Sequence, residues 1–414
     1  MTGTTGPAMS KTLYICYFGV SEPLVQTQVL PYLREIKKGG TEVSLLTFEP
    51  DRGIDTAGIR EKLAGEGIQW HSLPYHKRFS VIATAWDILR GSLFVRRFIS
   101  RERPDILHGR VHVPTLMGAL GRKFSRHKPK LLFDIRGFFP EEYTDAGVWP
   151  EGGLLYRSAK RVERWLLKEA DGFVVLTEKA RSILFPESAE TGFDKLGRPV
   201  EVIPCCVDIQ RFASAGAISR DEVRGELNLD GRFVVAYVGA FGGWYMTKET
   251  ADFFGALKEK NPNAFAMVLT QSPAEMIASL LRDRGYGTDD ILVTKVRPAE
   301  IARYLSAADA AVSFIKPCYS KQASSPTKNA EYLASGLPMV ANAGVGDVDS
   351  LIGDHGVGAI VSEMSDEGYS DAIDEVVRLE NISDHCREVA REEFDLEKVG
   401  GPRYRRIYAK LLND

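Results

Sequence analysis

The stretch from Ser324 to Asp347 reads SSPTKNAEYLASGLPMVANAGVGD and predicts a helix, a turn and a short buried strand. Ser324-Ser325-Pro326 is typical of a helix start, because hydroxyl groups cap free amides and proline suits the first turn. The helix is expected over Thr327 to Ser335, and Gly336 is a favourable C-terminal stop. Leu337 to Ala341 is then the strand.

The start of this predicted helix has the composition of an anion site. Amides at a helix N-terminus attract phosphate, and a lysine stands close by. Glu331 lies one turn further along, where its carboxylate can accept two hydroxyl hydrogen bonds from a ribose. These features predict the donor-binding part of a sugar-nucleotide pocket, formed by Ser324, Ser325, Pro326, Thr327, Lys328 and Glu331.

Two motifs in the chain resemble a known family. Glu331 to Pro338 reads EYLASGLP and is similar to the E-A-x-A-x-G-x-P signature of family 4 glycosyltransferases. Ile203 to Phe212 reads IPCCVDIQRF and resembles the I-P-N-G-V-D-x-x-x-F segment of that family, with Cys205 and Cys206 in place of Asn and Gly. The resemblance implies retaining enzymes with the two-domain GT-B fold. The alternative for the first motif is an ordinary helix–turn–strand with a surface glutamate.

The composition sets wider bounds on the function. A chain of 414 residues, 44% hydrophobic and 26% charged, is long enough for two or three globular domains. Its net charge of -3 argues against a general nucleic-acid binder. The five scattered cysteines lack zinc-site spacing and predict reduced thiols in the cytoplasm. Met1 to Ser10 has no signal-peptide pattern, and no apolar run is long enough to span a bilayer.

Strands and helices alternate along the first half of the chain. The first strand, Leu13 to Phe18, is followed by a helix over Gln26 to Lys38 and a strand over Val43 to Phe48. This order predicts a parallel, doubly wound sheet, in which ligands bind at the carboxyl ends of the strands. Gly19, which follows the first strand, is therefore a candidate donor-binding residue, although GxGxxG is absent here.

The alternation restarts at Phe233, which predicts a second domain. The expected fold class is α/β, with two Rossmann-like doubly wound domains facing each other across a cleft. We expect an N-terminal acceptor-side domain over 1–208 and a nucleotide-sugar-binding domain over 209–395. By the family's pattern, a C-terminal helix over 396–414 crosses back to the first domain.

Three basic residues in the first half are candidate catalytic residues. His108 and Arg110 are placed at the end of a strand expected over Pro104 to His108. Arg136 follows the strand over Leu131 to Ile135, roughly where the resemblance implies a histidine. A guanidinium there can bind phosphate or carboxylate in a bidentate manner, but it cannot act as a base. Glu331 completes the catalytic set implied by the resemblance.

The sequence departs from the family at two positions. Many members place Arg or Lys after the first glycine of the second domain, whereas Gly239 is followed by an alanine. Glycine amides at Gly239, Gly242 and Gly243 can still cradle phosphate, with Lys328 or Arg297 supplying the charge. The second departure is Ala323, which stands where the first of two paired glutamates is expected.

No cofactor and no metal is expected. Asp347-Val348-Asp349 matches a metal-chelating DxD, but it follows a strand and a glycine loop, so Asp347 is interpreted as a helix cap. The implied chemistry is transfer from a nucleoside-diphosphate sugar, with electrostatic stabilisation of the leaving diphosphate.

The helix expected over 81–101 belongs to a strongly basic segment. From Lys77 to Arg103, seven basic residues accompany two acids. One interpretation is peripheral contact with anionic lipid at the inner face of a membrane. The other, which we favour from sequence, is a helix packed on the sheet with a solvated basic edge.

The sequence therefore predicts a cytoplasmic, retaining hexosyltransferase that acts on a glycan, a lipid-linked or a small-molecule acceptor. Two alternatives stay open at this point. One is an isomerase similar to sugar-nucleotide 2-epimerases, which share the architecture, and the other is a non-catalytic nucleotide-sugar-binding protein.

Overall fold

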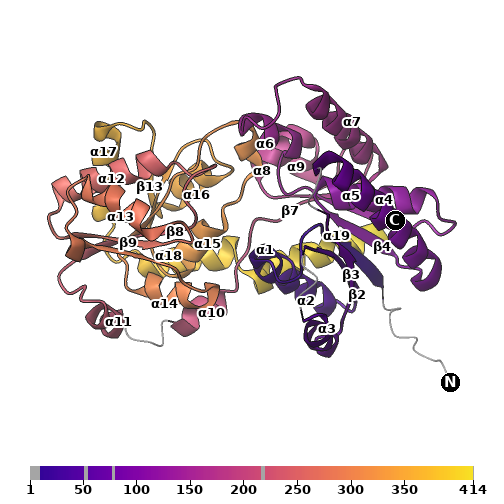
Figure 1. Cartoon of the computed structure of the whole chain (residues 1–414), viewed down its shortest axis with the longest axis horizontal. Coiled ribbons are helices and arrows are strands. Elements are labelled where there is room, and N and C mark those ends of the chain that lie inside the picture. The colour runs from indigo at the N-terminus through magenta and orange to yellow at the C-terminus, as the bar shows by residue number, and fades with distance from the viewer. Residues whose placement is uncertain (1–9, 51–54, 77–79, 216–219, 414) are drawn as a thin grey trace. The chain divides into compact units, whose positions relative to one another are not determined.

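The computed structural model describes residues 10–50, 55–76, 80–215 and 220–413. These form two compact units, each built on a parallel sheet and labelled in Figure 1. Unit 1 comprises residues 1–203 and 400–414, and unit 2 comprises residues 204–399. The chain thus leaves unit 1 after Ile203 and returns to it at Gly400, whereas the sequence places these changes after residues 208 and 395.

Unit 1 contains a seven-stranded sheet in the order β3-β2-β1-β4-β5-β6-β7. Its strands are β1 (Lys11–Ile15), β2 (Glu42–Glu49), β3 (Ile68–Pro74), β4 (Ile106–Arg110), β5 (Lys130–Asp134), β6 (Gly172–Val175) and β7 (Val200–Val202). Its helices are α1 (Pro23–Gln28), α2 (Leu30–Lys38), α3 (Thr56–Gly65), α4 (Ser80–Glu102), α5 (His112–Lys123), α6 (Phe139–Asp145), α7 (Leu154–Glu169), α8 (Glu178–Leu184), α9 (Ser188–Thr191) and α19 (Gly401–Asn413).

Unit 2 contains a six-stranded sheet in the order β10-β9-β8-β11-β12-β13. Its strands are β8 (Phe233–Val238), β9 (Ala264–Leu269), β10 (Ile291–Thr294), β11 (Ala310–Ser313), β12 (Met339–Asn342) and β13 (Gly358–Val361). Its helices are α10 (Ile209–Ala215), α11 (Arg220–Glu226), α12 (Thr247–Lys260), α13 (Ala274–Arg282), α14 (Ile301–Ser306), α15 (Thr327–Ala334), α16 (Val348–His355), α17 (Asp366–Val377) and α18 (Ser383–Glu393). Short 3₁₀ turns cover Thr288–Asp290, Pro298–Glu300 and Tyr319–Ala323, and a π-helical turn covers Leu396–Gly400.

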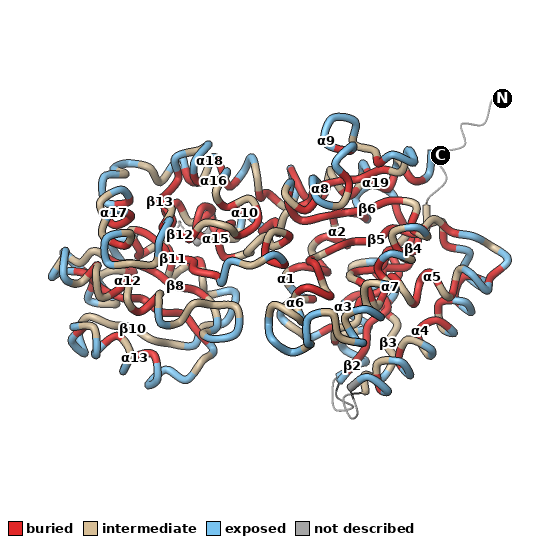
Figure 2. The backbone as a smooth tube through the Cα atoms, turned by 90° about the horizontal axis from the view of Figure 1, so that it is seen from above, coloured by how far each residue is buried: buried red, intermediate tan, exposed pale blue. Residues whose placement is uncertain are grey.

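Both sheets confirm the predicted class of two Rossmann-like doubly wound domains. Every strand pair in them is parallel, and strand order reverses between β1 and β4 in unit 1 and between β8 and β11 in unit 2. The central strands are buried on both faces, which Figure 2 shows as red segments inside each unit. In such sheets the reversal opens a crevice at the carboxyl ends of the two strands, where ligands bind.

Several boundaries differ from the sequence-based expectations. The helix expected over Gln26 to Lys38 is two helices that meet at Val29, because Pro31 lies in the first turn of α2 and cannot donate a helical hydrogen bond. The segment 187–199, expected as a loop, contains α9. Lys77 and Arg78 lie outside the described residues, as do residues 1–9 and 216–219. No helix in the described ranges is long and apolar enough to cross a membrane.

Candidate functional site

The candidate site residues of unit 2 lie near the carboxyl ends of β8 and β11. Helix α15 begins beside them, and Tyr332 fixes its position: the Tyr332 hydroxyl accepts from the Val238 amide at 2.9 Å and donates to the Val312 carbonyl at 3.2 Å. Since Val238 ends β8 and Val312 lies in β11, a single buried hydroxyl ties α15 to both strands. The first turn of α15 is thereby held at the crevice.

Lys328 is the central side chain of this site. It is only 7% exposed, and its Nζ has no hydrogen-bond partner in the described structure. Nζ lies 4.5 Å from the ring centroid of Tyr237 and 4.2 Å from that of Tyr245. Burial lowers the pKa of Lys328 from 10.5 to about 7, although the nearby Glu331 carboxylate opposes this shift. An ammonium group without a hydrogen-bonded acceptor is costly to bury, so an anionic ligand would relieve this cost.

The side chain of Lys328 lies beside Gly239. The residue that follows Gly239 in the sequence is an alanine and carries no charge. A Cβ built on Gly239 would lie 3.4 Å from Lys328 Nζ, and the glycine has φ +137°. At that distance a Cβ would make ordinary contact with the lysine, so the positive φ is what favours glycine at this position. Of the two expected cations, Lys328 and Arg297, Lys328 is the one that lies beside this loop.

The glycine loop is a tight turn that leaves the Gly243 amide open. Gly242 (φ +86°) donates its amide to the Thr247 hydroxyl at 2.9 Å, and Tyr245 closes the turn by donating to the Gly242 carbonyl. Gly243 (φ +62°) is exposed, and its amide has no hydrogen bond among the described residues. Of the three loop glycines Gly239, Gly242 and Gly243, all of them described, Gly243 is the one whose amide is available for a phosphate oxygen.

The start of α15 is left uncapped by side chains. The expectation that Ser324 or Ser325 caps the helix is wrong: Pro326 occupies the N-cap position, and no side chain accepts from the first amides. Ser325 Oγ instead accepts from the Cys205 amide at 3.0 Å. The amides of Thr327 and Lys328 consequently remain available to an anion.

Glu331 lies one turn along α15, as expected. Its Oε1 accepts from Arg211 Nη2 at 3.2 Å, and Oε2 makes no hydrogen bond in the described part of the chain. Burial raises the pKa of Glu331, while Arg211 and Lys328 lower it. The carboxylate is therefore held by Arg211 with one oxygen still able to accept. Sequence analysis missed Arg211, whose only signal is its place in the Ile203 to Phe212 motif.

Arg297 is not brought to this cluster. It follows β10, the outermost strand of the sheet and two strands from β8, which is roughly 10 Å at normal strand spacing. Its side chain is 82% exposed and pairs with Glu300, whose pKa falls to about 2 through hydrogen bonds from Arg297. The ring of Trp244 already contacts a cation of the protein, because Lys321 Nζ lies 4.0 Å from its ring centroid. Asp347 stands at the N-cap of α16 but makes no capping hydrogen bond.

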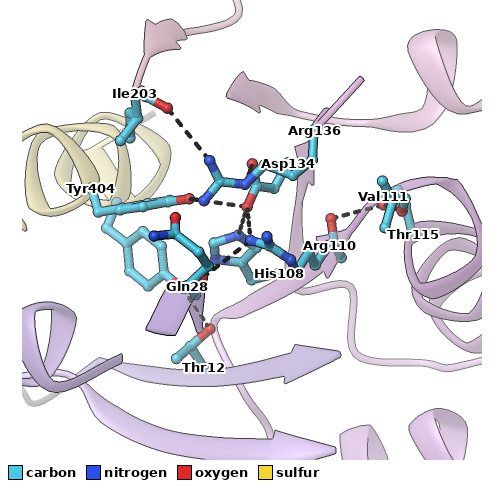
Figure 3. Close-up of polar contacts among 12 residues, drawn as sticks. Thr12, Gln28, His108, Arg110, Val111, Thr115, Asp134, Arg136, Ile203 and Tyr404 are labelled. Atoms are coloured by element: carbon cyan, nitrogen blue, oxygen red, sulfur yellow. Dashed lines mark hydrogen bonds and ion pairs between the residues drawn. The ribbon is translucent and has the colours of Figure 1, made fainter. Parts of the chain in front are cut away.

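The candidates of unit 1 form a separate, buried polar cluster (Figure 3). The expectation that a strand ends at His108 is wrong, because β4 continues through Gly109 and Arg110, which pair with Phe133 and Asp134. His108 is completely buried, and its Nδ1 and Nε2 lie 3.0 Å from the Tyr408 hydroxyl and 3.3 Å from Asp134 Oδ2. Burial lowers the pKa of His108. It has no exposed atom with which to contact a ligand.

Asp134 holds both arginines of this cluster. Arg136 Nε lies 3.2 Å from Asp134 Oδ1, and Arg110 Nη1 lies 3.9 Å from Oδ2, while the Tyr404 hydroxyl donates to Oδ2 at 2.9 Å. Burial opposes ionisation, but Arg136, His108 and Arg110 together keep the pKa of Asp134 well below its usual range. Arg136 also donates to Tyr404 and to the Ile203 carbonyl. Asp134, Tyr404 and Tyr408 were not identified from sequence, because their roles arise only from packing.

Gly19 lies in unit 1, in the loop after β1. Its amide donates to Glu22 Oε1 at 3.2 Å, and a Cβ there would lie 2.9 Å from Pro50 Cδ. A glycine is therefore required for the packing of this loop, independently of any ligand.

Comparisons with known proteins agree with the two-unit architecture. The family description "Glycosyl transferase 4-like domain" matches residues 25–188, and "Glycosyl transferases group 1" matches residues 219–393. The chain belongs to the family 4-like glycosyltransferases. A search among curated proteins finds no match.

Solved structures share the GT-B fold of this glycosyltransferase at low identity. A glycosyltransferase from Rickettsia africae is 14% identical with a TM-score of 0.70, covering 99% of this chain and 100% of that one. Sucrose-phosphate synthase from Thermosynechococcus elongatus is 15% identical with a TM-score of 0.70, covering 97% and 100%. HepE from Anabaena, in complex with UDP-glucose, is 14% identical with a TM-score of 0.66, covering 96% and 99%.

We predict that Lys328→Met raises the melting temperature of this glycosyltransferase in the absence of ligand. Methionine keeps the apolar stem between Tyr237 and Tyr245 and removes a buried group that lacks a hydrogen bond. The expected rise at pH 7 is about 2–4 °C, the shift that ~1 kcal/mol gives in a domain of this size. Thermal melting followed by circular dichroism measures it.

The difference should shrink between pH 7 and pH 9. The lysine pKa is lower in the folded state than in the unfolded state, so the unfolded state binds more protons in this range and the stability of the natural chain rises with pH. Lys248→Met, at an exposed lysine, is the control and should leave the melting temperature unchanged. A lower melting temperature for Lys328→Met would contradict the assignment of an unsatisfied ammonium.

Proposed function

We propose that the chain transfers a hexose from a nucleoside-diphosphate sugar to a hydroxyl group of a glycan, a lipid-linked or a small-molecule acceptor, with retention of anomeric configuration. The observation that carries the proposal is the buried Lys328 ammonium, without a hydrogen-bond partner, beside Gly239 and at the uncapped start of α15. The HepE structures in complex with UDP-glucose and with UDP support this class of ligand.

The residues of unit 2 suit a departing diphosphate. In the proposal, Lys328, the first amides of α15 and the Gly243 amide contact the phosphates and stabilise the charge that develops as the bond to the sugar breaks. The free oxygen of Glu331 accepts from a ribose hydroxyl, while Arg211 fixes the carboxylate. Since these residues already supply a cation and amides, we propose that transfer needs neither a metal ion nor a cofactor.

We propose positioning roles for His108, Arg110 and Arg136. Each is buried around Asp134, and the cluster fixes the ends of β4 and β5 through contacts among its own members. In this proposal they shape the acceptor-side domain and contact no reacting atom. We further propose that the enzyme acts in the cytoplasm, because none of its five cysteines, all of them described, forms a disulfide, as is usual in a reducing compartment.

Transfer activity is the first test. Incubation with UDP-glucose and other nucleoside-diphosphate hexoses should release the nucleoside diphosphate only when a glycan, lipid-linked or small glycoside acceptor is present. The anomeric coupling of the product, measured by NMR, should match that of the donor, and EDTA should not reduce the rate. Conversion of the donor without an acceptor would instead favour an isomerase. Tight binding without turnover across the acceptor panel would favour a binding protein.

The roles of Lys328 and Glu331 can be separated with two ligands. We expect Lys328→Met to weaken UDP binding by roughly 10- to 150-fold, the loss that corresponds to a charge-assisted hydrogen bond of ~1.5–3 kcal/mol. Uridine binding should be unchanged, because it lacks the phosphates. Glu331→Gln should weaken UDP and uridine alike, because both carry the ribose.

Isothermal titration calorimetry of each variant with both ligands makes this comparison, and Lys248→Met serves as the control. Equal losses for UDP and uridine in Lys328→Met would show that the lysine only shapes the loop, and the phosphate assignment would fail.

A further inference from the structure

Helix α4 presents an apolar stripe to solvent. Ile82, Trp86, Leu89 and Leu93 are 74%, 52%, 50% and 43% exposed. Their spacing of four, three and four residues places them on one face of the helix, in a continuous row of three turns. Single exposed apolar residues are common on proteins, but a contiguous row that includes a tryptophan marks an interaction surface.

The opposite face of α4 is firmly attached to unit 1. The Asp87 carboxylate is fully buried, where it accepts from the Tyr17 hydroxyl at 2.8 Å and lies 2.5 Å from His76 Nδ1. Further along, Val95 and Ile99 are completely buried. The stripe is therefore the outer face of a fixed helix, and Figure 2 draws buried and exposed stretches alternating along it.

The same outer face becomes basic in the second half of the helix. Arg96, Arg97 and Arg101 are exposed, and none of them has an ion pair in the described part of the chain. The end of α5 extends this basic region, because Gly121 lies against Val95 and the Arg96 backbone. The exposed residues that follow Gly121 include Lys123, Phe124, Arg126 and Lys128.

The sequence left two interpretations of this helix, and the structure agrees with a packed helix whose exposed edge is basic. The structure adds that Trp86, Leu89 and Leu93 lie on the outer face, and that the exposed arginines of α4 are confined to its C-terminal half. The acidic residues of α4 do not offset them, since Asp87 is buried and Glu102 stands at the last position.

We propose that this α4 face, defined by Ile82, Trp86, Leu89, Leu93, Arg96, Arg97 and Arg101, docks on the surface of an anionic lipid bilayer. Apolar and aromatic side chains enter the headgroup boundary, while arginines meet lipid phosphates. Charge complementarity favours this partner. The chain as a whole has a net charge of -3, so the exposed arginines gathered on α4 form a local basic region that would attract anionic lipid. A second copy is disfavoured, since two α4 helices packed antiparallel about the middle of the helix would set the arginines of one against the apolar stripe of the other. The proposal rests on α4 and does not depend on the sugar-transfer proposal.

Cosedimentation with vesicles tests the proposal on the full chain. The protein should bind vesicles of phosphatidylcholine containing about one third phosphatidylglycerol, bind pure phosphatidylcholine much more weakly, and dissociate as sodium chloride is raised. Arg96→Glu with Arg97→Glu should lower the partition coefficient at least about twentyfold, since each basic residue near the surface contributes about fivefold. Trp86→Ser with Leu89→Ser should lower it at least about tenfold.

Matched variants on unit 2 control for net charge and hydrophobicity. Arg378→Glu with Arg391→Glu, and Met276→Ser with Val377→Ser, alter exposed residues of the same kinds and should leave vesicle binding unchanged. The proposal is overturned if the natural chain fails to bind anionic vesicles at low salt, or if the α4 variants bind as well as their controls. It is also overturned if Trp86→Ser with Leu89→Ser only converts a dimer to a monomer, which light scattering would show.

Discussion

The site of unit 2 depends on one constraint: the ammonium group of Lys328 is buried without a hydrogen-bonded acceptor. The Tyr237 and Tyr245 rings offset part of the cost through cation–π attraction, which is worth about 2 kcal/mol or more when desolvated. Tyr332 makes the arrangement possible, because its hydroxyl holds α15 against β8 and β11. The ammonium group nevertheless still lacks a hydrogen-bond acceptor, and a diphosphate is the kind of ligand that would supply one.

In unit 1, by contrast, the buried charges are paired with one another. Asp134 neutralises Arg110 and Arg136 and accepts from His108 and Tyr404, so every member of the cluster has a partner within the protein. A closed cluster of this kind fixes structure but offers little to a ligand. The two sheets have similar strand orders, but of the two polar clusters built from described residues, the one in unit 2 contains a buried ammonium without a hydrogen bond. This contrast supports a division in which unit 2 binds the donor.

The alternation of strands and helices could be predicted from sequence, because apolar runs and glycine stops mark them directly. The positions of Lys328 and Glu331 on α15 could also be predicted, since their spacing from the helix start is a local property. The burial of His108 was missed because the extension of β4 to Arg110 depends on pairing with Phe133 and Asp134, far along the chain. For α4, the apolar pattern identified a helix with two kinds of surface but could not tell which face meets the sheet. The structure decides this, with Trp86 on the exposed side and Asp87 on the buried side.

The protonation of Lys328 tests the central claim most directly. With ¹⁵N-labelled lysine, NMR can follow Nζ as a function of pH in the free chain and in the chain saturated with UDP, with exposed Lys248 as internal reference. The account predicts a pKa near 7 in the free chain and a clear rise with UDP, because the phosphates favour the charged form. An ordinary pKa in the free chain, or a pKa that UDP does not change, would contradict it.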